Sequence, residues 1–374
     1  MFKNIPFHRV NWKTSIFLMV TTLISFTAVP WYIWKYGLDL FQVSMFFFYV
    51  VATIMSITLG YHRLFSHLAF KAKWPVKFLT LVFGAAAFEN SCLSWASDHR
   101  HHHKHCDHDG DPYDISNGFF YAHIGWLLFK LDPMPVMDNV KDLQRDKMVM
   151  WQDKWVHLIA IIAGIVIPTG LTYLFSGFTA ALGVFLITGF LRIVVVQHCT
   201  FFINSLCHMI GTRPYNSDNS ARDSAIMAFF TCGEGYHNYH HSFQHDYRNG
   251  VKPWQFDPTK WMIWLLSKFG LTSGLRTVAD EKILLAEMRE ANRLLDKKRG
   301  GMTEVAEATP FQQRAEEMIE VLSDRLAECY TKVEESVANK VQLSREALVE
   351  IQTEIHSVVK GIGKDLKHIP VRSK

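Results

Sequence analysis

Four long apolar runs stand out in the hydropathy pattern of this chain. They comprise residues 14–34, 40–59, 157–175 and 179–200. Each is close to the ~20 residues that an α-helix needs to cross a bilayer, so the pattern predicts an all-α integral membrane protein with four transmembrane helices. The run at 75–88 is too short to span and predicts an interfacial or re-entrant helix. Arg192 is expected near the cytoplasmic end of the fourth run or in the bundle interior, because charge is costly in hydrocarbon; a lipid headgroup contact is the alternative.

Charges beside the runs predict their orientation. Lys3, Arg9 and Lys13 precede the first run, whereas the short connection at 176–179 carries no charge. Because short cytoplasmic loops are enriched in Lys and Arg, both termini and the long segment 61–156 are expected to face the cytoplasm. The first run is too long for a removable signal peptide and lacks a small-residue cleavage site, so an uncleaved anchor is expected.

The pattern changes from about residue 281. Apolar or small residues at three-four spacing among many charges recur at 315, 318, 322, 326, 329, 333 and 337, and again at 348, 351, 355, 358 and 362. This spacing predicts one or two amphipathic helices, and a helix folded back on the rest of the protein or on the membrane is favoured over a dedicated coiled coil. We therefore divide the chain into a membrane domain, 1–280, and a helical C-terminal extension, 281–374, to which we assign no chemistry.

Nine histidines and one asparagine fall into four short clusters. The clusters are HRLFSH at 62–67, HRHHH at 99–103, NSLCH at 204–208 and HNYHH at 237–241. Since each residue of an α-helix advances by about 100°, each i, i+3, i+4 triplet presents three imidazoles from one face. The triplets are His99, His102 and His103, and His237, His240 and His241. His62 and His67 would lie about 140° apart on an ideal helix and are expected to straddle a metal pair. Asn204 and His208 are expected to share a face, with the amide reaching its metal through water.

The types of side chain in these clusters limit which metal ions they can bind. Imidazoles without thiolates suit several metals, but a closed structural zinc site needs only four ligands, so nine histidines predict two open ions. Iron is the expected metal, because it accepts many neutral ligands and keeps an open coordination position for dioxygen. The tract HRHHHKHCDHD alone resembles an adventitious metal-binding segment. A non-catalytic metal-handling membrane protein is a further alternative, although the spans lack the polar residues of a transport path.

The composition argues against a nucleic-acid-binding protein and against a disulfide-rich protein. The formal net charge is only +4 and 49% of the residues are hydrophobic, so the chain carries no nucleic-acid signal. The six cysteines form no CxxC pair and no disulfide framework, which fits a reducing, cytoplasmic environment.

The four motifs, separated by two hydrophobic pairs, resemble those of the integral-membrane acyl-CoA desaturases of the stearoyl-CoA Δ9 type. The resemblance covers about residues 12–275 and includes SWASDHRHHH, GFFYAHIGWLLF, GTRPYNSDNSARDS and EGYHNYHH. It implies a cytoplasmic helical cap carrying a histidine-rich di-iron site that activates dioxygen and removes two hydrogens from a saturated acyl chain, in unsaturated fatty acid biosynthesis. The implied ligands are His62, His67, His99, His102, His103, His208, His237, His240 and His241, with Asn204 acting through water.

The resemblance also implies substrate contacts. Positions matching those that bend the acyl chain are Glu89, Trp95, Thr200 and Phe201. Glu89 and Phe201 stand where the family has a glutamine and a tryptophan. Asp98 and Lys130 match positions that hold coenzyme A, but Ser97 replaces a basic residue beside Asp98. Acyl-CoA is favoured as the substrate, and an acyl group on a phospholipid or carrier protein is the alternative.

Electrons must come from elsewhere. The chain shows no Rossmann glycine fingerprint and no cytochrome b5 motif of the HPGG kind, so an external donor is expected. Ferredoxin, cytochrome b5 or a flavin-iron-sulfur reductase would fit. A histidine-box hydroxylase or alkane monooxygenase is the alternative enzyme, but the NxxxH and HNYHH forms favour desaturation.

Overall fold

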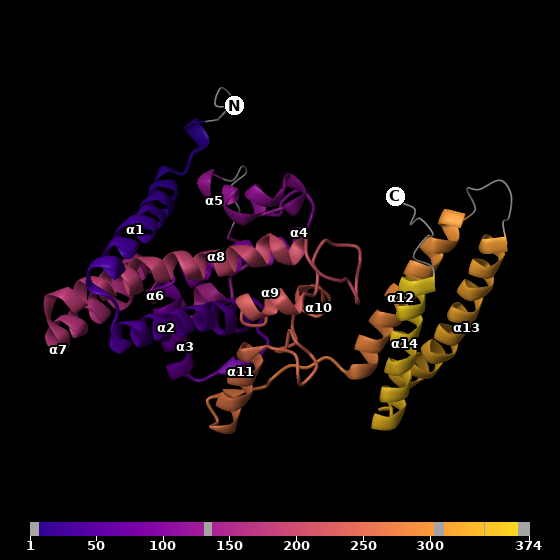
Figure 1. Ribbon diagram of the computed structural model, residues 1–374. Helices are drawn as coiled ribbons and strands as arrows, with labels where there is room; N and C mark the ends of the chain where they lie inside the picture. Colours follow the sequence, from indigo (N-terminus) through magenta and orange to yellow (C-terminus); the bar gives the residue numbers. More distant parts are fainter. Residues whose placement is uncertain (1–6, 131–136, 303–309, 340, 366–374) are drawn as a thin grey trace. The chain divides into compact units, whose positions relative to one another are not determined.

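The computed structural model describes residues 7–130, 137–302, 310–339 and 341–365. The chain divides into two compact units, one made of Met1–Gly211 and Asn219–Thr277 and the other of Thr212–Asp218 and Val278–Lys374 (Figure 1). The described residues are mainly helical, as predicted. The sheet among them is one antiparallel pair of two-residue strands, β1 (Lys71–Ala72) and β2 (Thr272–Ser273). Lys3, used above to predict orientation, lies outside the described residues.

The first unit is built from α-helices linked by short 3-10 and π-helical segments. Its α-helices are α1 (Trp12–Tyr36), α2 (Leu40–Met55), α3 (Trp74–Ala85), α4 (Cys92–His105), α5 (Trp126–Leu128), α6 (Lys147–Ile161), α7 (Ile167–Val184), α8 (Arg192–Asn204), α9 (Ala225–Phe230), α10 (His237–Ser242) and α11 (Pro258–Lys268). The π-helices are η2 (Ser56–Ser66), η4 (Tyr121–Gly125), η6 (Ile162–Val166) and η7 (Phe185–Leu191), and the 3-10 helices are η1 (Phe7–Arg9), η3 (Ile115–Asn117), η5 (Leu143–Arg145) and η8 (Leu206–His208).

In the described part of the chain, three helices are long and apolar enough to cross a membrane. They are Trp12–Tyr36, Leu40–Ser66 and Lys147–His208. The first two coincide with the first two predicted spans. The third contains 62 residues and covers both remaining runs in one continuous segment. Its helical geometry nevertheless breaks at Gly177 (φ 78°, ψ −175°), within the predicted connection 176–179. Glycine adopts this conformation without a Cβ clash, so the two legs turn back on each other there, and α7 packs on η7.

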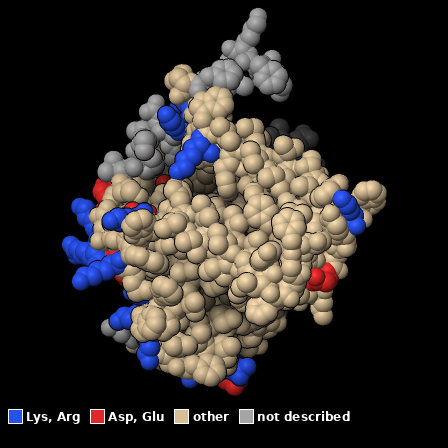
Figure 2. All heavy atoms as spheres, turned by 90° about the vertical axis from the view of Figure 1, so that its left-hand side faces the viewer, with Lys and Arg blue, Asp and Glu red and all other residues tan. Residues whose placement is uncertain are grey.

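One end of the membrane helices exposes an almost uncharged surface. The left-hand side of Figure 1, where α7 lies, faces the viewer in Figure 2, and Lys, Arg, Asp and Glu are sparse over most of it. On α7, Leu174, Phe175 and Phe178 are 76%, 81% and 71% exposed. Exposed apolar area of this extent fits contact with hydrocarbon rather than water.

Arg192 is fully buried in the bundle interior, one of its two predicted positions, and the headgroup alternative is wrong. Its guanidinium donates to the carbonyls of Thr188 (3.0 Å), Gly164 (3.2 Å) and Ala86. Ala86 caps the C-terminus of α3, where the helix dipole places partial negative charge, so the three carbonyls offset the cost of burying the cation.

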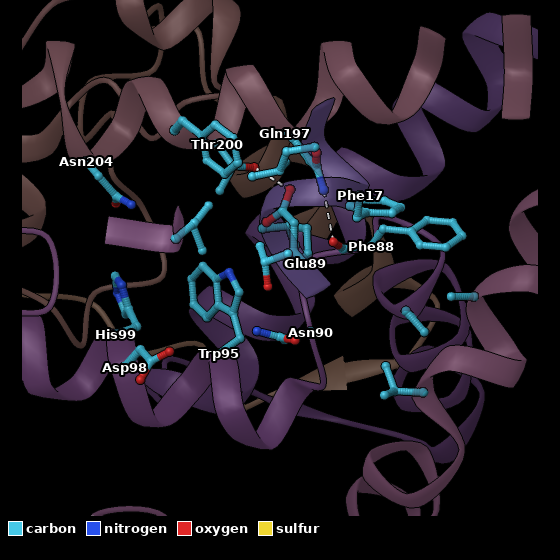
Figure 3. Close-up of a pocket in the computed structure, with 18 of the residues that line it drawn as sticks. Phe17, Phe88, Glu89, Asn90, Trp95, Asp98, His99, Gln197, Thr200 and Asn204 are labelled. Carbon is cyan, nitrogen blue, oxygen red and sulfur yellow. Dashed lines mark hydrogen bonds between the residues drawn. The ribbon is translucent and has the colours of Figure 1, made fainter. Parts of the chain in front are cut away.

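Side chains of α8 donate hydrogen bonds to the backbone of the turn that follows α3. Gln197 Nε2 donates to the Phe88 carbonyl at 2.9 Å (Figure 3), next to the Arg192 bond to Ala86. Phe88 and Asn90 have φ values of 61° and 69°, a left-handed conformation that non-glycine residues adopt only when the surroundings impose it. This turn carries Glu89 to the cavity described below.

The described residues of the second unit form three helices, where the sequence predicted one or two. They are α12 (Asp280–Met302), α13 (Pro310–Ala338) and α14 (Arg345–Asp365). Their apolar stripes pack on one another around a common core that includes Met288, Ile319, Leu326 and Val358. The helix missed by the sequence reading is α12, whose apolar stripe is interrupted by many charges. Its partners bury that stripe, so the unit has a hydrophobic core of its own.

Replacing Ile319 with alanine is expected to destabilise the second unit by about 2–5 kcal/mol, because this fully buried side chain would leave a cavity in a packed core. Val321 lies on the same helix but is 54% exposed, so Val321→Ala should cost less than about 0.5 kcal/mol. Limited proteolysis of the full chain, followed at sites between 278 and 374, measures the difference. Equal protection of the two variants would contradict the shared core.

Candidate metal centre

Four elements that are distant in the sequence bring the nine clustered histidines together. The π-helix η2 carries His62 and is capped by His67, α4 carries the HRHHH cluster, η8 carries His208, and α10 begins at His237. All nine side chains lie in two groups with their ligand nitrogens close together; seven of them are buried, and His103 and His241 are half-buried.

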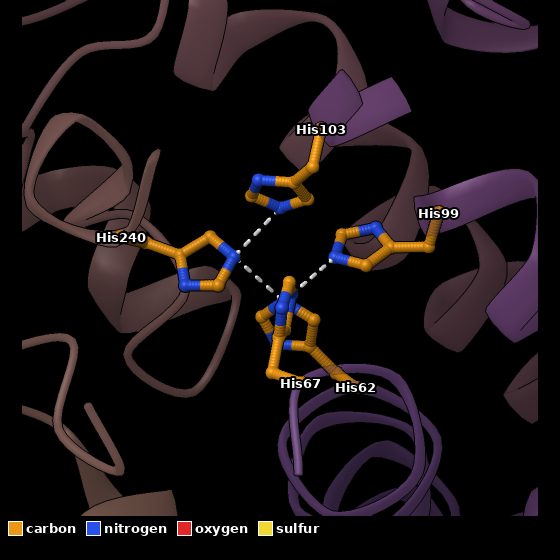
Figure 4. A group of neighbouring side chains, drawn as sticks. All are labelled: His62, His67, His99, His103 and His240. Atoms are coloured by element: carbon orange, nitrogen blue, oxygen red, sulfur yellow. Dashed lines mark hydrogen bonds between the residues drawn. The ribbon is translucent and has the colours of Figure 1, made fainter. Parts of the chain in front are cut away.

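The first histidine group consists of His62, His67, His99, His103 and His240, whose ligand atoms all lie within 4.8 Å of one another. Figure 4 shows the rings of η2, α4 and α10 converging on one point. The Nε2 atom of His240 lies 2.9 Å from that of His62 and 2.9 Å from that of His103, and the Nε2 atoms of His67 and His99 are 2.8 Å apart. Five imidazole nitrogens therefore surround one point.

The second histidine group consists of His102, His208, His237 and His241. The Nε2 atom of His237 lies 3.1 Å from that of His208 and 3.1 Å from that of His241, and His241 is 3.3 Å from His102. Each i, i+3, i+4 triplet is thus divided between the groups. Helices α4 and α10 therefore each contribute side chains to both groups.

The expectation that His62 and His67 straddle two metals is wrong, because both belong to the first histidine group. The helix carrying them is π-helical, and the His67 N–H donates to the His62 carbonyl at 3.1 Å. An i to i+5 hydrogen-bond register places residues five apart on one face, whereas the α-helical geometry used for the prediction separates them. Their ring centroids are 4.8 Å apart.

The pair Asn204 and His208 also departs from its prediction. The α-helix ends at Asn204, and His208 is carried by the 3-10 turn η8, so the two do not share a face of one continuous α-helix. His208 enters the second histidine group, whereas Asn204 lines the cavity beside it. A role for the amide through water stays a prediction.

Acidic side chains behind the histidines were not singled out from the sequence. Glu234 Oε2 lies 2.8 Å from His62 Nδ1, and Asp111 Oδ1 accepts from His102 Nδ1 at 2.8 Å. His208 Nδ1 lies 2.7 Å from Ser220 Oγ, which in turn donates to Asp107. Glu234 opens the EGYHNYHH stretch, and Asp107 and Asp111 follow HRHHH, so their proximity in sequence was the available signal.

These carboxylates determine which nitrogen of the imidazole is free. When Nδ1–H donates to a carboxylate, the Nε2 of a neutral imidazole carries only a lone pair. Burial raises the pKa of Glu234, but the neighbouring Arg63 and His62 outweigh it and lower the pKa to about 2, so the acceptor stays ionised. His62 and His102 therefore direct lone pairs into the first and second histidine groups respectively.

The two groups fit cations. Burial lowers the pKa of His99 and His103 well below the ordinary value, and that of His237 to about 3, so protonation of these rings at neutral pH is unfavourable. Neutral imidazoles whose lone pairs converge at about 3 Å repel one another unless a positive ion lies between them. Sets of five and four nitrogens fit two metal ions that accept imidazole, such as iron.

Cys106 is the described thiol beside the second histidine group, close to His102 and His208. Burial and the Asp107 and Asp111 carboxylates raise the pKa of this thiol, so it stays protonated and is a poor ligand. All six cysteines are free, in agreement with the absence of a predicted disulfide framework.

A cavity of about 370 Å³ lies next to the first histidine group, since His62 and His99 line it. It extends from His62, His99 and Asn204 to an apolar end at Phe17 and Phe88 (Figure 3). Five of the six predicted substrate-contact residues line it, namely Glu89, Trp95, Asp98, Thr200 and Phe201. The sixth, Lys130, is exposed and does not line it; its backbone N–H donates to the Arg9 carbonyl at 2.7 Å.

The described histidines that the sequence left out of the ligand set lie outside both groups. His123 Nε2 lies 2.9 Å from His198 Nδ1, and His123 Nδ1 lies 3.0 Å from Ser205 Oγ. His245 Nδ1 donates to the His67 carbonyl at 2.9 Å. These contacts support neighbouring backbone and rings without bringing further imidazoles to either group.

Replacing Asp111 with asparagine is expected to weaken metal binding by the second histidine group about tenfold, because the His102 Nδ1–H loses its charged acceptor. The exposed Asp109 in the same loop supplies the control variant Asp109→Asn, which should bind metal like the wild type. Iron per chain, measured during a chelator titration, reports the difference. Identical titrations of both variants would contradict the assigned role of Asp111.

Comparisons with known proteins agree with this geometry. The family model described as "Fatty acid desaturase" matches residues 40–269. The chain is 42% identical over 246 residues to the "Probable acyl-CoA desaturase" of Schizosaccharomyces pombe, an alignment that covers 65% of this chain and 50% of that protein. For "Acyl-CoA desaturase 1" of Saccharomyces cerevisiae the identity is 36% over 302 residues, covering 79% and 58%. The human "Stearoyl-CoA desaturase" is 33% identical over 283 residues, covering 73% and 76%. The chain thus spans about half the length of the two fungal relatives it matches.

Proposed function

Because the chain belongs to the fatty acid desaturase family, we propose that it introduces a double bond into a saturated fatty acyl chain during unsaturated fatty acid biosynthesis. The observation that carries this proposal is the placement of two buried histidine groups, of five and four imidazoles, beside an apolar cavity. A methylene group has no acidic proton, so general acid and base groups alone cannot remove its hydrogens.

Each histidine group would hold one iron ion. Bound iron would supply the oxidising chemistry in which dioxygen is reduced to water with two electrons from an external donor and two hydrogens leave adjacent carbons of the chain. The carboxylates of Glu234 and Asp111 would keep His62 and His102 in the tautomer that binds a cation. Asn204, at the cavity wall, would act through water. The donor would be a ferredoxin, a cytochrome b5 or a flavin-iron-sulfur reductase.

The cavity would position the acyl chain and exclude water. Its wall combines Phe17, Trp95 and Phe201 with the polar pair Glu89 and Thr200, so an apolar chain would pass the histidine end at a fixed depth. The names of the relatives favour an acyl-CoA substrate, and the resemblance favours the Δ9 position. Asp98 would contact the carrier at the cavity, and Lys130, exposed outside the cavity lining, would meet its phosphates.

The proposed membrane arrangement has four spans. Gly177 divides the 62-residue helix into two legs, which, with Trp12–Tyr36 and Leu40–Ser66, makes four crossings. Both termini and the histidine groups would then face the cytoplasm, with α3 as an interfacial or re-entrant helix. The C-terminal extension would be a helical unit attached to this enzyme.

Expression in a host that lacks its own desaturase tests the proposal. Gas chromatography with mass spectrometry of the cellular fatty acids should detect a new monounsaturated acid, and the position of the double bond would give the regiochemistry. Hydroxylated products would instead assign the chain to the histidine-box hydroxylases. Unsaturation confined to intact phospholipids would favour the acyl-lipid substrate, and bound metal without any product, despite a competent donor, would favour a metal-handling protein.

A further inference from the structure

Glu89 places a carboxyl group in the middle of the apolar cavity. It lies in the turn between α3 and α4, and Figure 3 shows its side chain between Trp95 and Thr200. Its Oε1 accepts from the Thr200 hydroxyl at 2.9 Å. Its Oε2 is buried and has no hydrogen-bond partner among the residues that the structure describes. The unpartnered oxygen therefore belongs to a side chain that forms part of the wall along which an acyl chain would lie.

The surroundings of Glu89 contain no buried ammonium or guanidinium partner among the described cavity-lining residues. The titratable and charged groups on the elements packed around it are Tyr61 of η2, Asp98 of α4, Asp153 of α6, and Cys199 and Arg192 of α8, with His62, His99 and Glu234 toward the metal end and Lys13 of α1. The Arg192 guanidinium does not line the cavity, because its hydrogen bonds go to the carbonyls of Thr188, Gly164 and Ala86. Lys13 lies at the exposed mouth, where its Nζ is 2.8 Å from His157 Nε2. An ionised Glu89 would thus face the cavity without a counter-ion.

Burial raises the pKa of Glu89 to about 8, although the Thr200 hydroxyl and the Trp95 indole beside the carboxyl group both oppose the shift. The neutral acid therefore predominates below about pH 8, and the carboxylate predominates above it. A neutral carboxyl group tolerates methylene groups at its second oxygen. A bare carboxylate in the same place would lose its remaining water when an acyl chain enters, which is strongly unfavourable.

We infer that Glu89 is a specificity-determining residue of the cavity, which admits a saturated acyl chain only while its carboxyl group is protonated. This inference rests on the proposed function, because the ligand is the acyl chain of the proposed substrate. Glu89 is one of the positions predicted to bend the acyl chain, and the family resemblance has a glutamine there. The inference gives a physical role to this replacement of an amide by a titratable acid. The amide cannot ionise, so a chain carrying it would lack this pH dependence.

Binding measured without turnover tests the inference. The full chain, purified without an electron donor, is titrated with a saturated C18 acyl-CoA by isothermal calorimetry between pH 6.5 and 9.5. The dissociation constant of the wild type should be constant at low pH and increase about tenfold per pH unit well above pH 8, as expected for one ionisation. Glu89→Gln keeps the size of the side chain and an acceptor for Thr200, so its dissociation constant should not depend on pH in this way.

Two controls make the outcomes distinguishable. Coenzyme A alone reports any effect of pH on carrier binding, and the unfolding temperature of Glu89→Gln should equal that of the wild type. A wild type that binds the ligand equally at all pH values, or a parallel pH dependence in Glu89→Gln, would overturn the inference alone. Failure of both proteins to bind the acyl-CoA even at pH 6.5 would overturn the proposed substrate and the inference together.

Discussion

Replacing either His103 or His241 with alanine is expected to abolish the monounsaturated product, a loss of at least about 100-fold, since even residues behind metal ligands contribute 10–100-fold. His103 belongs to the first histidine group, where its Nε2 lies 2.9 Å from that of His240. His241 belongs to the second, where its Nε2 lies 3.1 Å from that of His237. Each substitution removes one imidazole from a different proposed iron site, and the proposed chemistry needs both sites.

Product and metal are measured separately for these variants. Cellular fatty acids are quantified by gas chromatography with mass spectrometry, and iron per chain is measured on the purified proteins. His101→Ala is the matched control, because His101 lies on the same helix as His103 but in neither group. The control should retain product and iron. Full activity of His103→Ala or His241→Ala, with verified expression in the membrane, would contradict the assignment of the corresponding group.

Replacing Glu234 with glutamine is expected to destabilise the protein by about 3–5 kcal/mol, because it removes one partner of a buried ion pair. The carboxylate is 1% exposed and lies 2.8 Å from Arg63 and 2.8 Å from His62 Nδ1. Asp257 remains beside Arg63 at 3.0 Å, so the guanidinium keeps part of its compensation. The loss of the charged acceptor of His62 should also weaken metal binding at the first histidine group about 10–100-fold.

The two effects of Glu234→Gln are separated by measuring thermal unfolding of the metal-free protein and a chelator titration of the loaded protein. Asp142→Asn is the matched control, since Asp142 also pairs with an arginine, Arg100 at 2.7 Å, but its side chain is 43% exposed. Pairs of this exposed kind contribute about 0–1 kcal/mol, so the control should unfold near the wild-type temperature. A Glu234→Gln protein as stable as Asp142→Asn, with unchanged metal affinity, would show that the buried carboxylate has no such role.

Properties that depend on short stretches of sequence were predictable. The first two membrane helices, the turn at Gly177 and the interior position of Arg192 follow from hydropathy and the cost of a charge in hydrocarbon, both of which act locally. The nine clustered histidines were also identified from spacing alone. The C-terminal extension was predicted less well, because α12 mixes its apolar stripe with many charges and only α13 and α14 reveal which side it buries.

The grouping of the site was decided by tertiary structure. Whether His62 and His67 lie in one histidine group or in two depends on the π-helical hydrogen-bond register of η2, and a helical pattern in the sequence does not distinguish that register from the α-helical one. The division of each histidine triplet depends on how α4 and α10 meet in space.

By itself, then, the sequence determined the membrane class of this protein, its mainly helical fold and the identity of its nine clustered histidines, since residue type and periodicity are carried along the chain. Only the folded chain decided which imidazoles converge, that Glu234 and Asp111 support them from behind, and that Glu89 lines the cavity while Lys130 does not. The reason is that each of these contacts joins residues on different elements, and burial, charge pairing and hydrogen-bond register act between elements only after they have packed.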